Sequence, residues 1–317
     1  MYLNNKKKLL IIAPKFYDYI DLIKIEIEWL NFNVDIKYTF KHSLVTRILN
    51  SFGLNKAIKF IRKNYYDKIF HVLNNEYEIV VFITTILPIE YIDLIKKNNP
   101  NASYRLYLWD SISRIEISNE YLTKFDKIFS YSKQDSTDLD INYRPFFFNK
   151  IKLQNKQIDI SFVGKLHDKK RYEILKKIKY HYPDLNLKLH IYLDFYSYVK
   201  NVFKLNINYL DITHKKLPYT SYIDLLSKSL CILDIPTVEQ TEITTRVIEA
   251  LGTQTKIITT VKNITEYDFY RPENIFLLNN TNFQEIRLWL KTPYSPIEEE
   301  ILSRYSIENF INELIYK

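Results

Sequence analysis

Glycine is scarce in this chain of 317 residues, which contains Gly53, Gly164 and Gly252 and no others. The three glycines are far apart, so neither the glycine-rich fingerprint of dinucleotide sites nor the phosphate-binding P-loop is present. The sequence therefore argues against NAD or FAD chemistry and against ATP chemistry of the Walker type.

Cysteine is scarcer still, since Cys231 is the only one. A single cysteine excludes an internal disulfide, and its position in an apolar run predicts a packed core thiol rather than a catalytic one. We therefore expect a reducing compartment and a cytoplasmic location. The six histidines show no ligand spacing, so no zinc site is expected.

Long apolar runs are also lacking, because no stretch approaches the 18 or more residues of a membrane span. The apolar run 9–13 follows a basic start but is too short for a signal sequence, and it predicts a first strand. A hydrophobic content of 46% is that of a globular protein. The length suits two domains of about 150 residues each.

Positive charge is in excess, with a net charge of +8 at pH 7. This excess favours anionic partners, namely nucleotide diphosphates, phospholipid head groups or nucleic acid. A single-strand nucleic-acid binder would explain the charge and the 27 tyrosines. However, the tyrosines are scattered through the expected strands and helices instead of forming a stacking platform, so we expect no nucleic-acid partner.

Apolar runs bounded by turn signals alternate with helical patterns in two series along the chain. Such alternation predicts parallel, doubly wound sheets, and two series predict an α/β protein with two Rossmann-like domains. We place these domains at residues 1–150 and 151–317, with the linker at about 145–157. The first series has expected strands at 9–13, 34–38, 79–84, 104–108 and 127–131, and expected helices at 19–29, 44–73 and 90–97. The second series has expected strands at 158–163, 188–193, 230–235, 256–260 and 274–278.

The helical pattern 44–73 alternates basic with apolar residues. It fits either a membrane-surface face or a solvated basic face over a buried apolar stripe. The second interpretation is favoured, because it is the usual state of an amphipathic helix. The basic residues in the pattern are Lys56, Lys59, Arg62, Lys63 and Lys68.

The segment 240–252 lies between the expected strands 230–235 and 256–260, so it predicts a loop and a helix at the carboxyl edge of a sheet, where anions bind. Thr244 and Thr245 are hydroxyl donors and candidate N-caps. Arg246 stands in the first turn, where the helix dipole disfavours a cation, so it needs a partner and we expect a phosphate. Glu249 is expected either to pair with Arg246 or to turn toward a sugar hydroxyl.

Two further candidate groups follow expected strands. Asp110 closes the strand 104–108 beside Trp109, and the pair could orient an acceptor sugar, with Asp110 taking a proton from its hydroxyl. The alternative for Asp110 is a helix N-cap. Gly164 and Lys165 begin a loop that would let the backbone approach a ligand and place a cation near a leaving diphosphate.

Residues 104–276 carry, in order, pieces of one family pattern. The chain resembles bacterial glycosyltransferases of the two-Rossmann-domain (GT-B) type, in particular the lipopolysaccharide and capsule biosynthesis proteins related to the CgeB-like group. Order across this much chain is more specific than any single short motif. The matching pieces are Leu108 to Ser111, Phe125 to Ser130 with Asp135, Tyr143 to Phe147, Asp159 to Gly164 with Arg171, Leu217 and Pro218 with Tyr222, Thr244 to Gly252, and Tyr267 to Tyr270 before Asn274 and Ile275.

Two departures from the family pattern affect the site. Glu242 stands where family members usually carry glycine, which places a carboxylate beside the expected phosphate loop. Retaining enzymes of the wider superfamily separate two glutamates by seven residues, whereas six separate Glu242 from Glu249. Only Glu249 is therefore carried over.

The resemblance implies two Rossmann-like domains facing across a cleft, with a nucleotide-sugar donor on the second and a surface-glycan or glycolipid acceptor on the first. The last helix, 307–316, is expected to pack back onto the first domain. Asp110 would be the base of an inverting transfer. No cofactor and no metal is expected, and peripheral contact with the inner-membrane surface is compatible with such an acceptor. A catalytically silent partner subunit of the same fold is the alternative. The implied donor residues are Gly164, Lys165, Arg171, Tyr222, Thr244, Thr245, Arg246 and Glu249, and the acceptor residues are Lys15 and Trp109.

Three minor candidates complete the set. Tyr222 is expected to be core more than ligand contact, since aromatic side chains dominate core energetics. His167 is expected to be an ordinary surface residue. The triplet 138–140 imitates the metal-binding DxD motif of another glycosyltransferase fold and is expected to lie on the surface.

Overall fold

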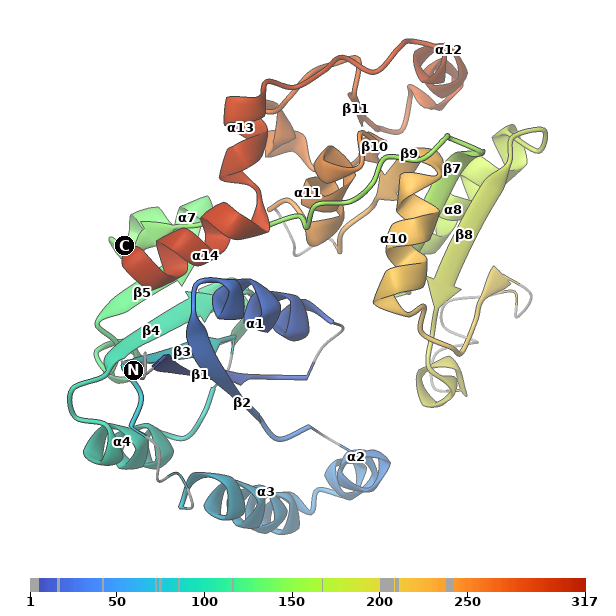
Figure 1. The fold of residues 1–317 in the computed structure, drawn as a ribbon. Coiled ribbons are helices and arrows are strands. Elements are labelled where there is room, and N and C mark those ends of the chain that lie inside the picture. The colour runs from blue at the N-terminus through green and yellow to red at the C-terminus, as the bar shows by residue number, and fades with distance from the viewer. Residues whose placement is uncertain are drawn as a thin grey trace. The chain divides into compact units, whose positions relative to one another are not determined.

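The chain forms two compact units, made by residues 1–145 with 310–317 and by residues 146–309. The computed structural model describes residues 6–15, 18–41, 43–71, 73, 76–84, 86–115, 117–166, 168–199, 208, 211–237 and 242–317. Each unit contains one sheet flanked by helices (Figure 1). The final helix α14 (Ile307–Tyr316) belongs to the first unit from Phe310 onward.

The sheet of the first unit has the strand order β2-β1-β3-β4-β5-β6, and these strands pair in parallel. The chain passes from β1 to β2 and then returns beyond β1 to β3, so the strand order reverses between β1 and β3. Crevices that hold ligands form at such a reversal, beyond the carboxyl ends of the strands. The strands are β1 (Lys7–Ala13), β2 (Phe32–Tyr38), β3 (Ile79–Ile83), β4 (Ser103–Leu108), β5 (Lys127–Ser130) and β6 (Asn142–Tyr143). The helices are α1 (Tyr19–Trp29), α2 (Leu44–Ser51), α3 (Asn55–Phe70), α4 (Ile89–Asn98), α5 (Ile112–Ile115), α6 (Asn119–Leu122) and α7 (Lys133–Asp138).

The sheet of the second unit has the order β11-β10-β9-β7-β8 and is also parallel, with its reversal between β7 and β9. The strands are β7 (Ile158–Lys165), β8 (Leu187–Tyr192), β9 (Ser229–Asp234), β10 (Lys256–Thr259) and β11 (Ile275–Leu277). The helices are α8 (Lys169–His181), α10 (Tyr219–Ser227), α11 (Thr245–Gly252), α12 (Ile286–Leu290) and α13 (Glu299–Arg304), with 3-10 turns η2 (Lys262–Glu266) and η3 (Phe283–Glu285).

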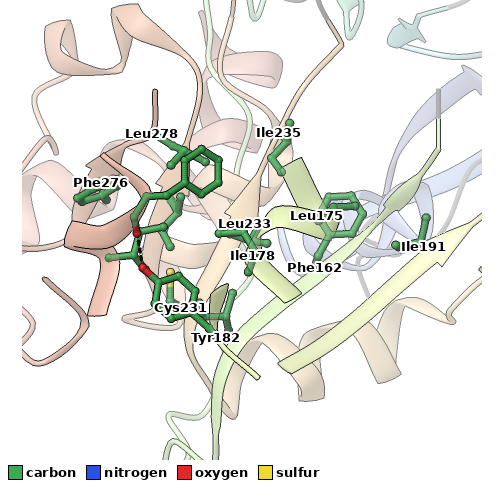
Figure 2. Close-up of a cluster of buried hydrophobic side chains, with 14 of the residues drawn as sticks. Phe162, Leu175, Ile178, Tyr182, Ile191, Cys231, Leu233, Ile235, Phe276 and Leu278 are labelled. Carbon is green, nitrogen blue, oxygen red and sulfur yellow. Dashed lines mark hydrogen bonds between the residues drawn. The ribbon is translucent and has the colours of Figure 1, made fainter. Parts of the chain in front are cut away.

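Apolar side chains from both sides of the reversal fill the core of the second unit. Phe162 on β7, Leu233 on β9 and Leu175 on α8 pack in one buried cluster (Figure 2). Cys231 is fully buried in the same cluster, so the prediction of a core thiol is confirmed. Burial also raises the pKa of the Cys231 thiol, which keeps it protonated and inert.

The expected single helix over 44–73 is wrong. The chain breaks at Gly53, whose φ of 70° is a left-handed conformation that glycine adopts without strain. The side chain of Ser43 caps α2 by accepting a hydrogen bond from the backbone N–H of Thr46. The favoured buried apolar stripe is present in the second half of α3, where Tyr66 and Phe70 are buried, and it is absent from the described side chains of α2.

Gly252 lies against the ring of Phe148. A Cβ at this position would come within 2.6 to 3.0 Å of three atoms of that side chain. The backbone of Phe148 is hydrogen-bonded to Tyr305 and Ile307, so the ring has little room to retreat. We expect Gly252→Ala to lower the free energy of unfolding by about 1–3 kcal/mol, the usual cost of overpacking. The higher helix propensity of alanine offsets at most about 1 kcal/mol of this cost.

Urea unfolding of Gly252→Ala measures this loss. Adding Phe148→Leu to the same variant should recover part of it, because the substitution removes the ring atoms that clash. An unchanged unfolding midpoint in Gly252→Ala would contradict the expected clash.

No helix in the described part of the chain is long and apolar enough to cross a membrane.

Candidate functional site

A buried carboxylate organises the carboxyl edge of the second sheet. Asp234 ends β9 beside the strand reversal and is fully buried. Its Oδ1 accepts a hydrogen bond from Thr244 Oγ1 at 2.7 Å, and its Oδ2 accepts one from Thr259 Oγ1 at 3.1 Å. A buried carboxylate is tolerated only with such partners. Asp234 therefore joins the ends of β9 and β10 to the start of α11.

Arg246 is the cationic partner of this carboxylate. Its Nε and Nη2 each lie 3.2 Å from Asp234 Oδ1, and its Nη1 donates to the carbonyl of Val163 at 3.3 Å. A protein carboxylate is thus one partner that its position requires, and the phosphate partner stays a prediction. Three of the five guanidinium N–H groups have partners among the described residues, so two remain for a ligand. The side chain is 19% exposed.

The start of α11 is built differently from the sequence expectation. Thr244 occupies the N-cap position, but its hydroxyl makes no cap hydrogen bond and donates to Asp234 instead. Thr245 is the first helical residue and is half-buried. The Thr244 side chain therefore satisfies none of the first N–H groups of α11, whereas the N–H of Val247 donates to the Thr244 carbonyl at 3.1 Å.

Glu249 and Tyr222 fasten α11 to α10. Glu249 is fully buried, and its Oε2 accepts a hydrogen bond of 2.8 Å from the Tyr222 hydroxyl. Burial, and then the neighbouring Glu249 carboxylate, raises the pKa of Tyr222 well above its usual value. The Tyr222 ring is buried as expected. The Tyr222 hydroxyl is thus one described partner of Glu249, and the contact of Glu249 with Arg246 or with a sugar hydroxyl stays a prediction.

Arg171 ties two loops at the same edge together. Its Nε donates to the carbonyl of Ile235 at 2.6 Å, and its Nη1 donates to the carbonyl of Lys165. Burial, followed by the nearby charge of Arg246, lowers the pKa of Arg171 to about 10. The loop that follows β7 is therefore held against the loop that follows β9.

The other predicted residues of this edge lie close by. Gly164 stands near the end of β7 against the ring of Phe162. The Lys165 side chain is 43% exposed, and its Nζ lies 3.7 Å from Asp194. The unusual Glu242 is buried and accepts a hydrogen bond of 2.9 Å from the Tyr267 hydroxyl.

A cavity of about 390 Å³ adjoins Arg171. It is bounded by the start of α8, by the segment after β9 and by the segment after β10. Three buried side-chain atoms of its lining residues have no hydrogen-bond partner among the described residues: Asp168 Oδ2, Thr237 Oγ1 and Asn263 Oδ1. Lys170 and Lys262 also line it. Unpaired buried polar atoms are costly, so this arrangement is typical of a site that a ligand or ordered water completes.

Sequence reasoning missed the most connected of these residues. Asp234 closes an apolar strand at its carboxyl end. The same pattern indicated Asp110 as a candidate, so Asp234 could have been predicted from the sequence. Asp168, Thr237 and Asn263 carried no such signal, because isolated polar residues in loops are common. Of the predicted donor residues, only Arg171 lines the cavity.

The predicted acceptor residues lie at the carboxyl edge of the first sheet. Lys15 follows β1 and is exposed, with its Nζ 5.5 Å from the Tyr38 ring centroid. The Trp109 ring packs against Tyr19 and Tyr107, with centroid separations of 5.4 and 5.7 Å. Trp109 is thereby held in place and stays half-buried.

Asp110 is not the residue that starts the following helix. The first N–H of α5, on Ile112, donates to Asp135 Oδ2 at 3.0 Å. Asp110 Oδ1 lies 3.8 Å from Arg114, and its side chain is 43% exposed. Burial raises the pKa of Asp110, and the Arg114 charge partly offsets this rise. The interpretation of Asp110 as a helix cap is thus disfavoured, whereas its role as a base stays a prediction.

Two minor expectations concern the remaining polar residues. Asp138 lies on α7 and accepts a hydrogen bond from Gln134, and Asp140 has a φ of 52°. His167 lies outside the described residues. No three His, Cys, Asp or Glu side chains of the described part gather as a metal-binding group.

No protein-family model matches the chain, and no curated protein matches its sequence. Solved structures do match its fold. Anabaena HepE in complex with UDP-glucose is 13% identical with a TM-score of 0.59, over 96% of this chain and 98% of that one. A putative UDP-N-acetylglucosamine 2-epimerase from Listeria monocytogenes is 13% identical with a TM-score of 0.51, over 98% and 95%. Acinetobacter baumannii MurG is 8% identical with a TM-score of 0.50, over 97% and 99%.

These likenesses establish the fold. The prediction of an α/β protein with two Rossmann-like domains of the GT-B type is confirmed, because both sheets are parallel and the matches cover nearly the whole of each chain.

Proposed function

We propose that the protein is a glycosyltransferase that moves a sugar from a nucleotide-sugar donor to a glycan or glycolipid acceptor. The observation that carries this proposal is the cavity beside Arg171. Its two lysines and the positive end of α8 suit negative charge, while its unpaired oxygen atoms suit the hydroxyl groups of a sugar. A molecule that bears both phosphate and sugar complements this lining.

The neighbouring residues support the same ligand. The first two N–H groups of α11 and the two remaining donors of Arg246 would hold diphosphate oxygens. Lys165 and Lys170 add charge that would stabilise the leaving nucleotide diphosphate. Of the solved structures of this fold, HepE is described in complex with UDP-glucose.

The finer features of the proposal follow from the sequence. Within the GT-B group, the ordered motifs favour a relation to the CgeB-like lipopolysaccharide and capsule proteins, and hence a surface-glycan acceptor. A single buried cysteine suits the reducing cytoplasm. The cations at the carboxyl edge of the second sheet would replace a metal in neutralising the leaving group, so we propose transfer without a metal ion.

Calorimetric titration with UDP-glucose and other nucleotide sugars, in buffer with EDTA, tests the donor site. A donor at a hundredfold its Kd should also stabilise the fold by about 2.7 kcal/mol. We expect Asn263→Ala and Thr237→Val each to weaken binding about three- to tenfold, because each removes one hydrogen-bonding group from the cavity. Asn186→Ala, which alters an exposed amide outside the cavity, is the matched control.

Each outcome of the titration has a distinct meaning. Unchanged affinity in both cavity variants would exclude this cavity as the donor site. Binding that vanishes in EDTA and returns with magnesium or manganese would exclude metal independence. Donor binding without any sugar transfer would favour the alternative, a catalytically silent partner subunit.

A further inference from the structure

Apolar side chains of α2 and of the start of α3 lie in solvent. Val45 and Ile48 on α2 and Phe52 directly after it recur at the spacing of one helical face, and they are 61%, 42% and 76% exposed. On α3, Phe60 is 64% exposed. Burying this face would normally stabilise a helix, yet none of the described residues of the first unit covers it. Figure 1 shows α2 and α3 as successive helices at the margin of that unit.

The same segment is strongly basic. Residues 41–71 contain seven lysines and arginines against one acidic residue, Asp67. On α3, Lys56 and Lys63 stand four residues before and three residues after Phe60, so they flank its ring on the helix surface. All three lysines Lys56, Lys59 and Lys63 are exposed, and Lys63 also pairs with Asp67. The exposed ring of Phe60, flanked by lysines, therefore combines positive charge and apolar surface on one helix.

This combination fits a lipid surface better than a groove of another protein. The exposed apolar residues lie on and between two successive helices, and they are interleaved with exposed lysines, as on a helix that lies in the plane of a membrane surface. Rings flanked by lysines can enter the head-group region while the ammonium groups reach the phosphates. Anionic lipid attracts each basic residue near the surface, which matches the excess of positive charge.

We propose that the element formed by α2 and α3 docks the protein on an anionic lipid bilayer, with Phe52 and Phe60 entering the head-group region and Lys56 and Lys59 contacting lipid phosphates. This inference does not rest on the proposed glycosyl transfer, because it concerns a surface of the first unit that shares no residue with the donor cavity.

Co-sedimentation of the full chain with lipid vesicles tests the proposal. We expect binding to phosphatidylcholine vesicles that contain phosphatidylglycerol, and much weaker binding to pure phosphatidylcholine. Phe52→Ser with Phe60→Ser should lower the partition coefficient at least about tenfold, because two exposed rings no longer enter the membrane. Lys56→Gln with Lys59→Gln should lower it about tenfold and make the remaining binding less sensitive to salt.

Matched controls come from the second unit. Tyr180 and Leu288 are 83% and 75% exposed, so Tyr180→Ser with Leu288→Ser removes similar apolar surface elsewhere and should leave binding unchanged. Melting curves should be alike for all variants, since every altered side chain is exposed. Equal binding of the phenylalanine variant and the wild type would overturn the proposal. A wild-type dimer that this variant loses, as seen by analytical ultracentrifugation, would also overturn the proposal. A second copy of the chain would then cover the apolar face.

Discussion

Replacing Asp234 by alanine is expected to lower the free energy of unfolding of the second unit by about 3–5 kcal/mol, the usual cost of removing one partner of a buried ion pair. The carboxylate is fully buried and has three partners, the hydroxyls of Thr244 and Thr259 and the guanidinium of Arg246. Its removal leaves the largely buried Arg246 without this counter-ion and takes away the acceptor to which the Thr244 and Thr259 hydroxyls donate. Asp234→Asn should cost less, because the amide oxygen can still accept hydrogen bonds.

Urea unfolding followed by the fluorescence of Trp289 measures this loss within the second unit. A background of Trp29→Phe with Trp109→Phe makes Trp289 the only tryptophan. Asp184→Ala is the matched control. Asp184 forms a bidentate ion pair with Arg287 on the surface, where solvent screening leaves little net stabilisation. If Asp234→Ala and Asp184→Ala shift the midpoint equally, the central role of Asp234 is wrong.

The sequence predicted the fold well because parallel sheets leave a strong signal. A strand buried on both faces is a continuous apolar run, and the expected run 9–13 lies within β1, where all five residues are buried. The expected helix 19–29 coincides with α1. The short strand β6 was not predicted, since two residues carry no period. The break at Gly53 was also missed, because one glycine inside a basic amphipathic pattern does not reveal a left-handed turn.

The site was harder to predict, because side-chain partners come from elements distant in the sequence. The position of Arg246 correctly indicated a need for negative charge, but only the pairing of β9 with β10 and the start of α11 brings Asp234 to it. Tyr222 and Glu249 are 27 residues apart and meet through the packing of two helices. Local spacing therefore located the functional edge of the sheet, while tertiary structure decided which charges are already neutralised there.

The same distinction applies to Asp110, whose alternatives were a base and a helix cap. The N–H that a cap would hold is bound by Asp135, which also accepts a hydrogen bond from Ser130. Asp110 therefore does not cap α5. Burial raises the pKa of Asp110, so that its carboxylate takes up a proton more readily than an ordinary aspartate does. These features are compatible with the predicted role of Asp110 as a base that acts on an acceptor hydroxyl.

Asp110→Asn is therefore expected to lower turnover about a hundredfold or more while donor binding and stability stay close to wild type, because the amide keeps the shape but accepts no proton. Loss of base function also removes the acid limb of the pH profile. In the wild type, activity should fall as pH drops through the raised pKa of Asp110, at a higher pH than for an ordinary aspartate. Asp93→Asn, an exposed carboxylate paired with Lys124, is the matched control. Near wild-type turnover in Asp110→Asn would eliminate the base, and a large drop in its Tm would show that any lost activity is structural.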